Sequence, residues 1–164
     1  MSRCSEHDAW VRNTDRLEQT AQSVRQALLE ADDSRRGNPR ALRHRRDTRS
    51  DHERLETLDH IVFHIRDISG AIADTVWDRP GALRFDSELA TPMSAACRAV
   101  ADAIEQHGAE GVAGHRVLGE ATRALRLLVK AVDQRSTLRG QAMGPGVLTA
   151  MHLRRILMWL TRRG

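Results

Sequence analysis

Residues with chemically active side chains recur every four positions near the middle of the chain, at His52, Glu56, His60 and His64. On an α-helix these side chains lie one turn apart, and two such histidines can bind zinc when a third ligand comes from elsewhere. The apolar residues between them form a separate stripe, made of Leu55, Leu58, Val62 and Ile65. Because the stripe predicts the buried side of the helix, we expect the histidines on a solvated face and no metal site.

His64 has a second interpretation, because an exposed histidine on a helical bundle can carry a phosphoryl group. Phosphotransfer domains of this kind place a lysine and then a glycine three and four residues after the histidine. This chain has Asp67 and Ile68 there. An acid beside a phosphohistidine would repel it, so phosphotransfer is the least favoured of the alternative functions.

Motifs of nucleophilic or nucleotide chemistry do not occur in the sequence. There is no G-x-S-x-G, no P-loop, no G-x-G-x-x-G and no C-x-x-C. Cys4 and Cys97 are the only cysteines, too few for a disulfide framework. We therefore expect no catalysis, no cofactor and no metal.

Arginine is concentrated in one segment, between Ser34 and Arg54. The segment holds eight arginines and three acids, so its charge of +5 exceeds the +4 of the whole chain. Such a cluster favours an anionic neighbour, such as a phosphate-rich surface or an acidic protein. The residues expected to contact that surface are Arg35, Arg36, Arg40, Arg43, Arg45, Arg46 and Arg49.

Helical periodicity determines the fold class that the sequence predicts. Apolar residues recur at intervals of three and four, and no segment alternates with a period of two. The patterns and their breaks predict helices over residues 6–32, 40–77, 88–107, 115–136 and 147–162. We expect an all-α domain spanning residues 1–164: an antiparallel bundle of four main helices with a fifth, C-terminal amphipathic helix.

The buried faces of the first two helices are predicted from the same spacing. In the first helix the stripe is Trp10, Thr14, Leu17, Ala21, Val24, Leu28 and Ala31. In the second it is Leu55, Leu58, Val62, Ile65, Ser69, Ile72 and Val76.

Helix ends are predicted from proline, glycine and capping residues. Pro39 separates the first two helices, and the run Arg79-Pro80-Gly81 stops the second. The third helix starts with Thr91 as N-cap before Pro92, or earlier, at Ser87.

The chain contains no stretch that predicts a signal peptide or a membrane span. Its most apolar segment, residues 144–160, is interrupted by His152, Arg154 and Arg155, which are costly in lipid. We therefore expect a cytoplasmic protein.

Three segments resemble one family. The break Gly37-Asn38-Pro39-Arg40 and the helix 55–66 (LETLDHIVFHIR) look like the C-terminal cytoplasmic part of fusaric acid resistance and aromatic acid exporter (FUSC-like) proteins. Residues 147–157 (VLTAMHLRRIL) are similar to the apolar-then-arginine helix that ends many bacterial members of that superfamily.

The resemblance implies a helical module of a membrane efflux transporter for aromatic or other organic acids. It implies a location at the inner face of the plasma membrane, with the transmembrane part of a transporter or the anionic membrane surface as partner. The resemblance also implies that this chain has an accessory, oligomerising or regulatory role, and that it can form a homo-oligomer. The alternative is a stand-alone interaction protein whose arginines bind nucleic acid or an acidic partner, although no interleaved aromatic residues favour nucleic acid.

Overall fold

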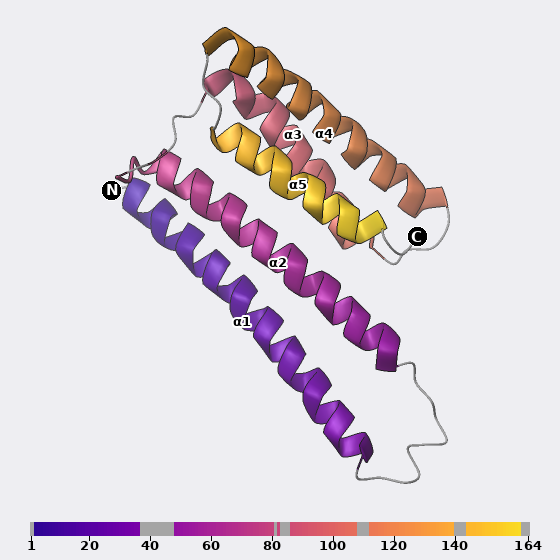
Figure 1. Cartoon of the computed structure of the whole chain (residues 1–164). Helices are drawn as coiled ribbons and strands as arrows, with labels where there is room; N and C mark the ends of the chain where they lie inside the picture. Colours follow the sequence, from indigo (N-terminus) through magenta and orange to yellow (C-terminus); the bar gives the residue numbers. More distant parts are fainter. Residues whose placement is uncertain are drawn as a thin grey trace. The chain divides into compact units, whose positions relative to one another are not determined.

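The described part of the computed structural model, residues 2–36, 48–80, 82, 86–107, 112–139 and 144–161, is almost entirely helical and contains no strand. The elements, drawn in Figure 1, are α1 (Ser2–Arg36), α2 (Thr48–Val76), the 3₁₀ turn η2 (Ser87–Leu89), α3 (Ala90–Glu105), α4 (Val112–Arg139) and α5 (Pro145–Thr161). The predicted all-α class is confirmed.

The contacts of the chain divide it into two compact units, Met1–Phe63 and His64–Gly164, and α2 contributes to both. In the first unit, α1 and the start of α2 run antiparallel (Figure 1). Arg25 of α1 donates to Asp59 of α2, with 2.5 Å between Nη2 and Oδ1. This hydrogen bond, helped by the carboxylate charge, raises the pKa of Arg25. The pair is largely solvated, so it orients the two helices more than it stabilises them.

The second unit is an antiparallel arrangement of the last part of α2 with α3, α4 and α5, the latter three shown side by side in Figure 1. Its core is formed by side chains that are at most 1% exposed, including Ala96, Val100, Ala121, Leu128 and Ile156. The apolar spacing of the sequence predicts inner stripes of Leu89, Met93, Ala96, Val100 and Ile104 for the third helix and of Val117 or Leu118, Ala121, Leu125, Leu128 and Val132 for the fourth. The central residues of both stripes are buried, which confirms these predictions there. The small side chains of Ala96 and Ala121 take little space between the helices, and the larger side chains fill the rest of the core.

The buried face of α2 differs from the predicted one. Among the described side chains, its buried residues are Thr57, Ile61, His64, Ile68 and Ala73, whereas the predicted stripe is half-buried and ends with Val76 at 59% exposed. The buried hydroxyl of Thr57 is hydrogen-bonded within its own helix, because it donates to the Glu53 carbonyl over 3.0 Å. The periodicity missed this face because two of its five members, Thr57 and His64, are polar residues.

The predicted stripe of α1 is also less buried than expected. Ala21 is its only buried member among the described side chains, and Trp10 and Val24 are 37% and 39% exposed. A single neighbouring helix segment within this unit covers only part of an apolar face.

The helices extend beyond the predicted bounds in polar segments, where the apolar pattern ends before the helix does. Thus α1 begins at Ser2 and reaches Arg36, and α4 runs from Val112 to Arg139. Residues 40–47, expected to open the second helix, lie outside the described residues.

The C-terminal end of α2 lies before the predicted stop at Arg79-Pro80-Gly81. α2 stops at Val76, ahead of Arg79, and Asp78 adopts a left-handed conformation with φ of 49°. The amide of Arg79 then donates to the Asp74 carbonyl over 2.9 Å, a bond typical of a helix C-terminus. Gly81 lies outside the described residues.

An aspartate, rather than the predicted Thr91, opens the following helical segment. Asp86 caps η2, and its Oδ1 accepts from the Glu88 amide over 3.1 Å. The 3₁₀ turn begins at Ser87, the earlier of the two predicted starts, and α3 itself begins at Ala90. Arg135 of α4 forms ion pairs with Glu88 and with Asp86, the latter over 3.7 Å, which attaches this turn to α4.

Gly146 marks the tightest approach of α5 to its neighbours. A Cβ built there would lie 2.8 Å from Leu89 Cδ1 and 3.4 Å from Val132 Cγ2, and both of those side chains are buried. We expect Gly146→Val to lower the free energy of unfolding by about 2 kcal/mol, because overpacking forces neighbours off their rotamers. Thermal unfolding followed by circular dichroism measures this. Gly119→Val is the control, since no atom beyond its chain neighbours and the nearby backbone of its own helix lies within 4 Å of the Cβ position. Equal melting temperatures for the two variants would contradict the prediction.

Candidate functional site

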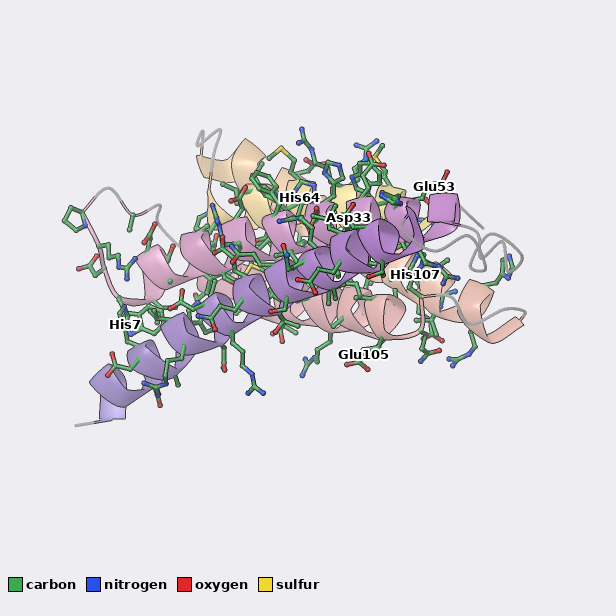
Figure 2. The ribbon with its side chains drawn as sticks, turned by 90° about the horizontal axis from the view of Figure 1, so that it is seen from below. His7, Asp33, Glu53, His64, Glu105 and His107 are labelled. Atoms are coloured by element: carbon green, nitrogen blue, oxygen red, sulfur yellow. The ribbon has the colours of Figure 1, made fainter. Side chains whose placement is uncertain are left out.

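Two histidines, 88 residues apart in sequence, meet inside the second unit. His64 comes from α2 and His152 from α5, and the two residues are 3% and 6% exposed. Their Nδ1 atoms are 3.0 Å apart, and the rings meet edge to face with centroids 5.1 Å apart and an angle of 62°. Figure 2 labels His64 on its ribbon. This His64–His152 pair is the most distinctive polar feature of the described core.

The distance between the two Nδ1 atoms restricts where protons can lie. One Nδ1 must carry a hydrogen and the other must accept it, because two hydrogens or two lone pairs would repel each other at 3.0 Å. The pair therefore accommodates two neutral rings of opposite tautomer, or one imidazolium beside one neutral ring. Both rings charged is the arrangement that the geometry disfavours.

Asp67 extends this arrangement toward the surface. One of its carboxylate oxygens, Oδ2, lies 3.8 Å from His152 Nε2, and the side chain is 35% exposed. His152 is thus placed between a buried imidazole on Nδ1 and a partly solvated carboxylate on Nε2. A carboxylate in this position favours a hydrogen on Nε2 of His152.

A groove of about 490 Å³ lies beside the pair. Its lining is mixed in charge and comes from α2, α5 and the segment between α2 and η2: Arg66, Asp67, Gly70, Ala71, Asp74, Ala82, Leu148 and His152. Within it, Asp74 accepts from Arg79 over 3.1 Å. The described lining residues include no serine, threonine or cysteine to act as a nucleophile.

The other members of the sequence motif are placed as follows. His52 and Glu56 are exposed, as predicted, and His60 is half-buried. The expectation of a solvated face is wrong for His64, because this face of α2 turns into the core. Across the described residues, no group of three or more histidines, cysteines and acids is arranged to hold a metal ion.

Burial also bears on the phosphotransfer alternative. A phosphohistidine domain must present its imidazole to a partner protein, whereas His64 is 3% exposed and its Nδ1 faces His152. The surface histidines are elsewhere: His107, which follows α3 and is labelled in Figure 2, is exposed. The environment of His64 therefore argues against phosphoryl transfer.

Most of the arginines predicted to meet an anionic surface lie outside the described residues. That holds for Arg40, Arg43, Arg45 and Arg46. Arg35 and Arg36 belong to the end of α1 and Arg49 to the start of α2, but their side chains are not among those described. Arg54, at the end of the segment, is exposed.

Cys97, on α3, is half-buried, and burial raises the pKa of its thiol. A raised pKa lowers the thiolate fraction and therefore the reactivity of the sulfur. Cys97 thus behaves as a packing residue.

Sequence reasoning singled out His64 but assigned no role to His152. The available signal was the histidine itself, beside Leu153 and one helical turn before Ile156. A polar residue inside an apolar helix indicates either a turn toward solvent or a buried partner. The sequence does not identify a partner 88 positions away.

Searches against protein-family models, curated proteins and solved structures found no match. Among the helices that the structure describes, none combines the length and the apolarity needed to cross a membrane.

Proposed function

We propose that this chain is the helical cytoplasmic module of a FUSC-like efflux transporter, located at the inner face of the plasma membrane. Its role is accessory: it supports the assembly, stability or gating of a membrane part that exports aromatic or other organic acids. The transport path belongs to that membrane part, and this chain contributes no catalysis.

One observation carries the proposal. The two longest segments that resemble the FUSC-like proteins, residues 55–66 and 147–157, are distant in sequence but contact each other through His64 and His152. Their meeting in one core supports the view that the resemblance reflects a shared packing arrangement rather than two unrelated helical patterns. The all-helical architecture agrees with a module of this kind.

The arginine-rich segment supports the proposed location. Anionic lipid headgroups attract basic residues by roughly 1 kcal/mol per charge near the surface. With a local charge of +5, residues 34–54 would hold the module against the inner leaflet or an acidic surface of the transporter.

An in-frame deletion of the 164 codons in the source organism tests the function. We expect export of an aromatic carboxylate to fall several-fold, measured as slower release of the preloaded acid and as greater growth inhibition by it. The physical reason is that the membrane part would lose a module that stabilises or gates it.

Re-expression of the chain is the control, and it should restore export. A second organic anion with an unrelated exporter should leave the cells at the same rate in all strains. Unchanged aromatic acid export in the deletion strain would overturn the proposal.

A further inference from the structure

We propose that the surface between α4 and α5 binds an amphipathic helix of a partner protein, one whose apolar stripe is flanked by carboxylates. The proposal concerns a surface whose lining does not include the His64–His152 pair, and it does not depend on the transporter assignment. It rests on the groove that these two helices form in the second unit, where they run antiparallel (Figure 1).

The groove has a volume of about 430 Å³ and is lined by the same spacing on both helices. Residues at positions i, i+3, i+4 and i+7 contribute from each: Thr122, Leu125, Arg126 and Val129 from α4, and Arg154, Leu157, Met158 and Thr161 from α5. A lining drawn from two helices over two turns is long and narrow. That shape matches one face of a third helix, as in helix-in-groove recognition.

Apolar side chains form the bottom and sides of the groove. Leu125 and Leu157 are nearly buried, at 7% and 6% exposed, whereas Met158 and Val129 are 59% and 40% exposed. A flexible, exposed methionine beside buried leucines is typical of surfaces that adapt to partner helices. Covering these side chains would remove apolar area from water, which favours an apolar stripe on the partner.

Among the polar groups of the groove, the threonine hydroxyls are already hydrogen-bonded, and the arginines favour a negatively charged partner. Thr122 donates to the Leu118 carbonyl over 2.8 Å and Thr161 to the Leu157 carbonyl over 2.9 Å, so both hydroxyls are bonded within their own helices. Arg126 and Arg154 are exposed and are the only charged residues among those described in the lining. Within the described part of the chain, no ion pair involves either of them. Carboxylates beside the partner's apolar stripe would meet this charge.

The same charges argue against a second copy of this chain as the occupant. A two-fold symmetric contact through the groove would bring Arg126 and Arg154 of one copy against those of the other, and like charges would oppose it. A small ligand is also disfavoured, because ligand pockets enclose most of their ligand and this groove is open along its length.

A synthetic helical peptide of about 18 residues, long enough to form a helix, is the probe for the experiment. It carries leucines at i, i+3, i+4 and i+7 flanked by glutamates, and a fluorescent label for anisotropy measurements with the full chain. A second peptide has lysines in place of the glutamates. We expect the glutamate peptide to bind at least about tenfold more tightly than the lysine peptide.

Charge reversal then locates the site. Arg126→Glu/Arg154→Glu should weaken binding of the glutamate peptide at least about tenfold and strengthen binding of the lysine peptide. The matched control is Arg123→Glu/Arg155→Glu, which changes the net charge equally at exposed residues outside the groove lining. The control should leave the preference for the glutamate peptide intact, and circular dichroism checks that all variants are folded.

Several results would overturn the proposal. They are equal affinity for the two peptides, equal effects of the two double variants, and no binding of either peptide. A further contrary result is that the wild-type chain self-associates in sedimentation and that Arg126→Glu/Arg154→Glu makes it monomeric. Another is that the wild-type chain binds anionic vesicles and that this variant abolishes vesicle binding while peptide binding is unchanged.

Discussion

Leu128→Ala is expected to lower the free energy of unfolding by about 3 kcal/mol, the largest effect of any single truncation considered for the second unit. Leu128 is fully buried, at 0% exposed, in the middle of α4. Truncation to alanine removes the transfer free energy of three carbon atoms and leaves a cavity among helices that can only partly collapse into it. Chemical denaturation followed by the helical circular dichroism signal measures the change.

The adjacent residue provides the control. Leu127 lies on the same helix but is 60% exposed, so Leu127→Ala should change stability by no more than about 0.5 kcal/mol. Leucine and alanine both favour helix, and the comparison therefore isolates burial from helix propensity. Equal losses in the two variants would mean that the second unit is not packed around α4 as described.

The second large effect concerns the His64–His152 pair. We expect His64→Leu and His152→Leu each to cost about 2 kcal/mol, because each leaves the Nδ1 of the other ring buried without this partner. Leucine is similar in volume to histidine, so the loss of a polar partner dominates over the loss of packing. Chemical denaturation near neutral pH measures all variants.

The double variant separates a hydrogen-bonded pair from two independent core residues. His64→Leu/His152→Leu removes both polar groups together, and we expect it to be less destabilised than either single variant, with a coupling energy of about 2–3 kcal/mol. Additive losses would contradict a direct interaction. His107→Leu, at an exposed position after α3, should change stability by about 0.5 kcal/mol or less.

These two predictions differ in how far the sequence anticipates them. The α4 stripe is predicted from spacing alone, because Ala121, Leu125, Leu128 and Val132 recur at intervals of four, three and four. All four are buried. A helix that packs one continuous apolar face shows its orientation in its own periodicity.

The α2 face is the contrasting case. The apolar residues of α2 predict one stripe, but the fully buried face includes Thr57 and His64. A polar residue is tolerated inside only where it finds a partner, and that partner is either local or distant. Thr57 finds the Glu53 carbonyl one turn away, whereas His64 finds His152 on another helix.

The helix ends also depend partly on local sequence and partly on residues from other helices. Apolar periodicity locates the middle of each helix, and polar segments such as the two ends of α1 extend the helix beyond it. The start of η2 depends on Asp86, whose carboxylate both caps the turn and pairs with Arg135 of α4. Such a cap is local in part, but its position is stabilised by a residue 49 positions later.

The sequence by itself determined the all-α class, the inner faces of α3 and α4, and the concentration of arginine in residues 34–54, because each depends on residues that are neighbours along the chain. Tertiary structure alone decided that His64 meets His152, which face of α2 is buried, and that α4 and α5 enclose an apolar groove with arginines beside it. These features join residues from different helices. Local spacing specifies that a helix has a buried side. Which side chains of another helix contact that side depends on how the helices pack.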